Sequence, residues 1–147
     1  MVYLNLYAVD LKSWPSILIA IATKSIYTHA NIQVGKEDIF DASGSADIVG
    51  WRKVKVYEHR PKRQIKLLIS ENKAHELLEK YNGLKYDRKA LKLWIFGQQD
   101  DLKVYCFEVC WMFLAEGSLL KVKAPSRMKR YTAKKILKFV LPNGFIK

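Results

Sequence analysis

The chain has 147 residues, of which 50% are hydrophobic and 27% are charged. This length and balance predict one ordered domain over residues 1–147 and argue against a disordered, low-complexity or fibrous chain. Lys and Arg number 26 against 14 Asp and Glu, a formal net charge of +12. That excess favours polyanionic surroundings such as nucleic acid, acidic lipid or a cell-wall polymer, without choosing among them.

The predicted elements alternate between strand-like and helix-like patterns. Strands are expected where apolar residues alternate with polar ones, and helices where apolar residues recur at helical spacing behind a capping residue. In chain order these are a strand at 2–9, a helix at 15–23, strands at 26–34, 39–42, 51–57 and 64–69, and helices at 71–81, 87–97, 106–116 and 133–141. Ser13, Ser70 and Thr132 are the expected caps of the helices at 15–23, 71–81 and 133–141. The predicted fold class is α+β.

The cysteine spacing and the first residues do not indicate a secreted protein. Cys106 and Cys110 have the spacing C-x-x-x-C, which is neither a disulfide framework nor a redox or zinc motif. The first residues show no basic segment followed by an apolar one, so no signal peptide is expected. Residues 14–22 are strongly apolar but about ten residues shorter than a membrane span, so we expect a buried helix there. A cytoplasmic protein is the expectation.

A predicted hairpin brings a histidine toward a carboxylate. Folding the chain back about Gly35 places His29 opposite position 41 or 42, and cross-strand Cβ atoms lie roughly 5 Å apart. Asp41 beside His29 would fix the imidazole tautomer and stabilise its charged form. Asn31 falls on the same strand face as His29. An ordinary exposed hairpin with unrelated polar residues is the alternative.

Cys106 stands at the start of a predicted apolar helix that Gly117 ends. A thiol in the first helical turn lies near unpaired backbone N–H groups and the positive end of the helix dipole, which favours thiolate over thiol. The alternative is a buried, inert cysteine. Cys110, one turn further along the apolar face, is expected to be inert. Neither a metal nor a cofactor is expected, because no His/Cys ligand spacing or Gly-rich phosphate loop occurs.

Four short motifs occur in order along the chain. They are Tyr27-Thr28-His29 before an apolar strand, Phe40-Asp41-Ala42, Gly83-Leu84-Lys85-Tyr86-Asp87, and Cys106-Phe107-Glu108-Val109. Their order resembles the circularly permuted branch of the NlpC-type papain-like peptidase superfamily. The resemblance covers residues 14–137, and lecithin:retinol acyltransferase-like enzymes share this permuted order, with a second histidine where this chain has Asp41.

The resemblance implies a permuted papain-like fold, with an antiparallel sheet or small barrel packed against the helix that carries the catalytic cysteine. It implies that Cys106 is the nucleophile, His29 the base and Asp41 the residue that orients the base. Substrate contacts are expected at Tyr86, Asn31 and Phe107. Tyr86 and Phe107 are expected at the wall of the cleft, and Phe107 departs from the family pattern, which often has Ser after the cysteine.

The implied activity is that of a thiol hydrolase that cleaves an amide or ester, with peptidoglycan-type γ-glutamyl peptides as the commonest family substrate. Without a signal peptide, access to a cell wall would need release on lysis or a phage particle. Two alternatives stay open. One is a lipid acyltransferase or amidase, with helix 15–23 and the positive charge docked on an acidic membrane. The other is a catalytically inactive basic module that binds a polyanion, with no specific nucleic-acid recognition expected.

Overall fold

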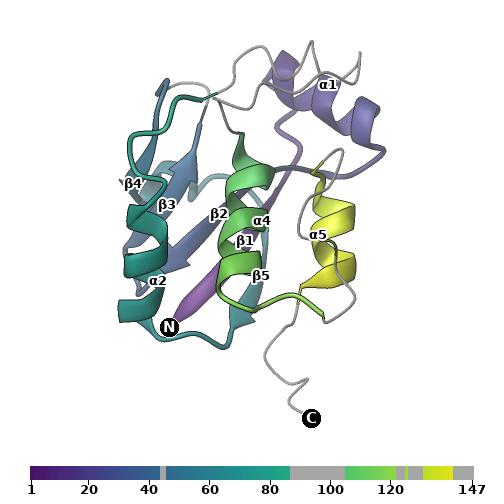
Figure 1. Cartoon of the computed structure of the whole chain (residues 1–147). Helices are drawn as coiled ribbons and strands as arrows, with labels where there is room; N and C mark the ends of the chain where they lie inside the picture. The colour runs from purple at the N-terminus through teal and green to yellow at the C-terminus, as the bar shows by residue number, and fades with distance from the viewer. Residues whose placement is uncertain (44–45, 87–104, 122–124, 126–130, 141–147) are drawn as a thin grey trace.

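The computed structural model describes residues 1–43, 46–86, 105–121, 125 and 131–140. Over these residues the protein is α+β, with a five-stranded antiparallel sheet and four α-helices (Figure 1). The predicted helix at 87–97 and much of the basic segment that follows residue 121 lie outside the described residues.

Most predicted elements are confirmed within a few residues. The strands are β1 Val2–Ala8, β2 Tyr27–Val34, β3 Asp38–Ala42, β4 Val49–Lys53 and β5 Lys62–Leu67. The helices are α1 Trp14–Thr23, α2 Glu71–Glu79, α4 Cys106–Glu116 and α5 Ala133–Phe139. The sheet order is β4-β3-β2-β1-β5, so that β4 and β5 form its two edges.

One strand was predicted too long. The alternating residues 51–57 suggest a strand throughout, but β4 ends at Lys53 and the chain turns into the short 3-10 helix η1, Val54–Tyr57. The turn carries Tyr57 into a part-buried position, where its hydroxyl bonds to a carboxylate of β3. A local pattern of alternation cannot report that distant contact, which outweighs the local strand preference.

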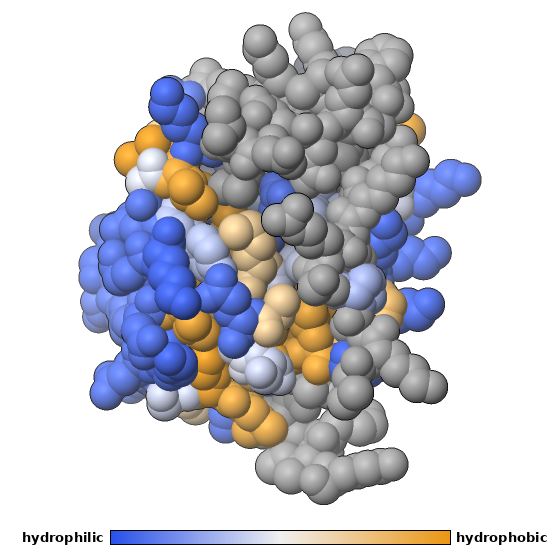
Figure 2. Space-filling view, viewed as in Figure 1, coloured by the Kyte–Doolittle hydropathy of each residue, from blue (hydrophilic) through white to orange (hydrophobic). Residues whose placement is uncertain are grey.

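Helices α2, α4 and α5 lie over one face of the sheet, with α4 between the other two (Figure 1). Apolar residues of the strands and of these helices form one buried cluster beneath α4. Figure 2 shows hydrophilic side chains gathered over the α2 side of this face and hydrophobic ones exposed between them. The largest fully buried members of the cluster are Trp111, Phe40, Phe113, Leu4, Leu6 and Ile32.

Helix α1 is exposed, which corrects the expectation of a buried helix. Ser16 is its one buried residue, whereas Trp14 and Ile21 are 74% and 68% exposed. The helix is apolar on every side, and its contact with β2 covers only one of those sides. No helix in the described part of the chain has the length and apolar character of a membrane span.

The predicted caps of three helices are confirmed. The side-chain oxygens of Ser13, Ser70 and Thr132 each accept a hydrogen bond from a backbone N–H in the first turn of the helix that follows, at 3.5, 3.2 and 3.2 Å. Each bond satisfies one of the N–H groups that a helix start leaves without an intrahelical partner. Local sequence therefore determines where these helices begin.

Candidate active site

The β2–β3 hairpin brings His29 and Asp41 into contact. Gly35 in the turn has a φ of 72°, a backbone conformation that glycine adopts without strain. The pairing register places Asn31 opposite Asp41, so the predicted alignment of position 29 with 41 or 42 was wrong by about two residues. The contact itself forms diagonally across the hairpin, with His29 Nε2 2.7 Å from Asp41 Oδ1.

Cys106 is the first residue of α4, and its side chain lies near enough to His29 to help raise the pKa of that imidazole. Because Nε2 of the imidazole is engaged by Asp41, Nδ1 is the ring nitrogen that remains for the sulfur. The residue before it, Tyr105, is held in place because its hydroxyl accepts the backbone N–H of Tyr131 at 2.8 Å. The helix start therefore delivers the sulfur to the histidine at the position that the sequence predicts.

His29 is held in its charged form. Burial by itself lowers the pKa of His29, but the charges on Asp41 and Cys106 and the hydrogen bonds with both side chains outweigh it and raise the pKa to about 10. The imidazole therefore carries a proton at neutral pH and stands between two acidic groups. A histidine in that state can donate a proton to a leaving group, and after donation it can accept one.

Asp41 is fully buried and surrounded by donors and positive charge. Its Oδ1 faces His29, while Oδ2 accepts a hydrogen bond from the Tyr57 hydroxyl at 2.7 Å and lies 3.4 Å from Arg52 Nε. Burial raises the pKa of Asp41, but the His29 charge, the two hydrogen bonds and the Arg52 charge outweigh it and hold the pKa below its usual value. The carboxylate is thus ionised and fixed in orientation.

Tyr57 is a member of this cluster that sequence reasoning missed. Its ring stacks on the His29 imidazole with 5.0 Å between centroids and 25° between planes, and it lies 4.8 Å from the Tyr7 ring. Burial and the nearby Asp41 charge raise the pKa of Tyr57, so its hydroxyl keeps its proton and donates. The one local signal was an aromatic residue at the end of the alternating segment, which by itself does not indicate a site.

Replacement of Tyr57 with phenylalanine should lower the free energy of unfolding by about 1.5–3 kcal/mol, the range for a hydrogen bond to a charged group. The ring that stacks on His29 is retained, while the hydroxyl that donates to Asp41 and interacts with Ser43 is lost. Urea denaturation at neutral pH measures the change. Tyr3→Phe is the matched control, because the Tyr3 hydroxyl donates to the Met1 sulfur at an exposed position. An equal loss of stability in both variants would contradict the role given to Tyr57.

A buried polar network lies beside the cluster and includes Asn31. The Asn31 amide donates to the Tyr7 hydroxyl at 3.3 Å and its oxygen accepts from Asn5 at 3.0 Å. Gln64 extends the network by donating to Asn5 at 2.9 Å. Asn31 is buried, so its predicted contact with substrate is not supported, because hydrogen bonds inside the sheet already occupy it.

The other two residues predicted at the cleft wall have different positions. Phe107 is buried in the core cluster beneath α4, so its predicted contact with substrate is not supported either. Tyr86 is half-buried, packs against the same cluster and donates its backbone N–H to Asp47 at 2.8 Å. The role of Tyr86 at a cleft therefore stays a prediction.

The two cysteines differ in their surroundings. Cys106 lies beside His29 and is 4% exposed, and the His29 side chain is 12% exposed, so both groups are largely shielded from solvent. Cys110 lies within the core cluster, where burial and then the neighbouring Cys106 charge raise the pKa of its thiol well above the usual value. The predicted burial of Cys110 on the apolar face is confirmed, and we expect its thiol to be unreactive.

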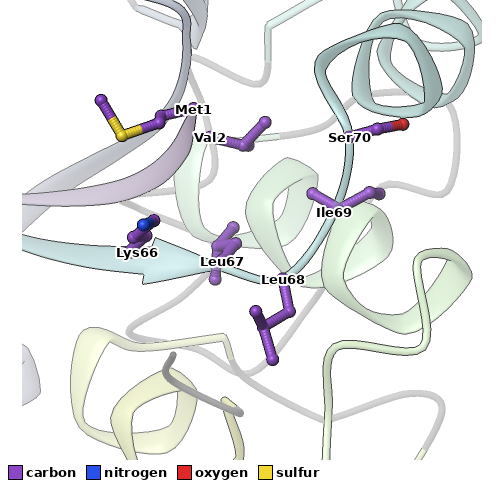
Figure 3. Close-up of a pocket in the computed structure, with 7 residues that line it drawn as sticks. All are labelled: Met1, Val2, Lys66, Leu67, Leu68, Ile69 and Ser70. Atoms are coloured by element: carbon purple, nitrogen blue, oxygen red, sulfur yellow. The ribbon is translucent and has the colours of Figure 1, made fainter. Parts of the chain in front are cut away.

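A surface pocket at the opposite end of β1 is separate from the cluster (Figure 3). It is lined by Met1, Val2, Lys66, Leu67, Leu68, Ile69 and Ser70, and in this list none is a member of the His29 cluster. Within the described ranges, no group of three or more His, Cys, Asp or Glu side chains is arranged to hold a metal ion.

Comparisons with known proteins give no family assignment. No protein-family model, curated protein or solved structure matches the chain.

Proposed function

We propose that the protein is a cysteine-dependent acyl-transfer enzyme, a thiol hydrolase of the permuted papain-like type, that cleaves an amide or ester. The observation that carries the proposal is the linked set of Cys106, His29 and Asp41. A helix-start thiol lies beside an imidazole whose Nε2 is 2.7 Å from a buried, ionised carboxylate, and both acidic groups raise the pKa of that imidazole. Nucleophile, acid–base group and orienting group in that order are the parts that acyl transfer requires.

Each side chain has a defined step. The Cys106 sulfur attacks the carbonyl carbon, and the proton on His29 passes to the leaving amine or alcohol as the acyl–nitrogen or acyl–oxygen bond breaks. Water or an amine then attacks the thioester, gives its proton to His29 and releases Cys106. Asp41 keeps the imidazole oriented throughout, because Tyr57 and Arg52 fix its second oxygen.

The backbone at the start of α4 can stabilise the charge that develops on the substrate. The first N–H groups of a helix have no intrahelical acceptor, and the helix dipole is positive at that end. The N–H of Cys106 therefore lies beside the carbonyl that its own sulfur attacks. A donor in this position stabilises an oxyanion as it forms, which is commonly a large part of catalysis by acyl-transfer enzymes.

The substrate class is proposed at the level of an acyl group on nitrogen or oxygen. Peptidoglycan-type peptides fit the resemblance that the motifs carry, and screening the purified protein on muropeptides, acyl-lipids and protein conjugates would identify the class. Acyl-lipids are the second candidate, because α1 exposes apolar residues and packs on β2 beside His29. A basic module that binds a polyanion without catalysis remains the alternative outcome of the test below.

A small thiol-directed acylating probe should label Cys106 before Cys110. Cys106 lies beside a charged imidazole, whereas Cys110 is buried as a neutral thiol. Peptide mass spectrometry after brief exposure of the folded protein measures the two sites separately. Cys110→Ala should label like the wild type and Cys106→Ala hardly at all, while equal labelling of the two cysteines would count against an active site.

A further inference from the structure

Helix α1 and its flanking residues form an exposed apolar surface, which we call the α1 surface. Trp14, Leu18 and Ile21 recur at the spacing of one helix face, and all three are exposed. Leu11 before the helix and Ile26 after it are exposed as well and extend the same end of the molecule. Isolated exposed apolar residues are ordinary, but five large ones on and around one ten-residue helix indicate a contact surface.

The segments of the chain beside α1 are rich in basic residues. The backbone N–H of Val9 donates to Ile26 at 2.7 Å and that of Ala8 donates to Pro61 at 2.9 Å, which hold three segments of the chain together beside α1. In these segments, residues 8–13, 24–26 and 58–63, five Lys and Arg residues stand against two acidic ones. The basic residues are Lys12, Lys24, Arg60, Lys62 and Arg63, and the acidic ones are Asp10 and Glu58.

We propose that the α1 surface docks on an acidic lipid bilayer, with α1 lying in the plane of the interface. A short helix with large apolar side chains and cationic flanks gains free energy both by burying those side chains at the acyl boundary and by attraction to anionic headgroups. Trp14 suits the interface, because its indole combines an apolar ring with an N–H donor. A protein groove would match the apolar stripe but would not call for the surrounding positive charge.

The docked orientation would bring the candidate active site close to the bilayer. The hydroxyls of Ser16 in α1 and Thr28 in β2 lie 2.7 Å apart, and Thr28 directly precedes His29. Arg60 joins the same contact by donating to Thr28 at 3.2 Å and to the Ala8 carbonyl at 2.6 Å. The docking itself does not depend on catalysis, so it can be tested in protein that lacks the Cys106 thiol.

The test is flotation of the full chain with vesicles of phosphatidylcholine alone or of phosphatidylcholine with phosphatidylglycerol. The wild type should float with the acidic vesicles and much less with the neutral ones, and added salt should reduce its binding. Trp14→Gln combined with Ile21→Gln should lower the bound fraction at least about tenfold, because both apolar contacts with the acyl boundary are lost. Circular dichroism of the variant checks that it is folded.

Two matched variants make the result specific. Leu68→Gln replaces an apolar side chain that is 49% exposed in the pocket at the opposite end of β1, and it should bind vesicles like the wild type. Cys106→Ala should also bind like the wild type. Three results would each overturn the proposal. They are an equal loss of vesicle binding in Leu68→Gln, unchanged binding by the double variant, and a wild type that does not bind vesicles but forms a dimer that the double variant loses.

Discussion

His29→Ala is expected to slow acylation of Cys106 by about a hundredfold or more at neutral pH, the usual contribution of a positioned acid–base group. The substitution removes the imidazole beside the sulfur and leaves the hydrophobic core beneath α4 unchanged. The rate is measured with the acylating probe by mass spectrometry of the Cys106 peptide, and the preference for Cys106 over Cys110 should disappear with it.

His59→Ala is the matched control for this experiment. His59 is exposed in the segment after η1, and it should leave the labelling rate unchanged. If both variants labelled at the wild-type rate, Cys106 would owe its reactivity to the helix start alone, and the proposed pairing with His29 would be wrong.

Asp41→Asn is expected to lower the free energy of unfolding by about 3–5 kcal/mol near neutral pH, the range for loss of one partner of a buried ion pair. The carboxylate is fully buried and meets His29, Tyr57 and Arg52, and the amide leaves the positive charges of His29 and Arg52 without a counter-ion. Chemical denaturation measures the loss. Asp38→Asn, on the same strand, breaks an exposed contact with Lys53 and should change the stability little.

The pH dependence of stability separates this electrostatic role from a merely structural one. His29 has a pKa of about 10 in the folded protein against 6.5 ordinarily, so its ion pair contributes fully below pH 6.5 and the contribution is lost as pH rises toward about 10. The pKa of Asp41 is lowered, so its contribution is present above the usual 3.8 and is lost as pH falls through the folded value. Asp41→Asn should flatten both limbs, and a loss of stability that is independent of pH would contradict the ion pair.

Several parts of the fold and of the candidate site could be predicted because they depend on local sequence. The caps Ser13, Ser70 and Thr132 and the start of α4 at Cys106 follow from short patterns of residues, and the structure confirms them. The pairing of His29 with Asp41 was also predicted, because a hairpin joins strands that are close in sequence. Even there, the register differed by about two residues, which alternation alone does not determine.

Other parts depended on contacts between distant segments. Tyr57 reaches Asp41 from 16 positions away, after a turn that replaces the second half of a predicted strand. Asn31 was assigned to a substrate surface, but it forms hydrogen bonds with Tyr7 and Asn5 of the neighbouring strand, within the sheet. Polarity shows that a side chain needs a partner but does not show whether that partner is a substrate or another strand.

The sequence by itself determined where most helices and strands begin, the hairpin that joins histidine to carboxylate, and the cysteine at a helix start, because each depends on residues a few positions apart. Only the tertiary structure decided that α1 is exposed, that Tyr57 completes the cluster, and that the two cysteines differ in environment. Exposure and pKa are set by whichever segments pack nearby, and in this chain those segments come from distant parts of the sequence.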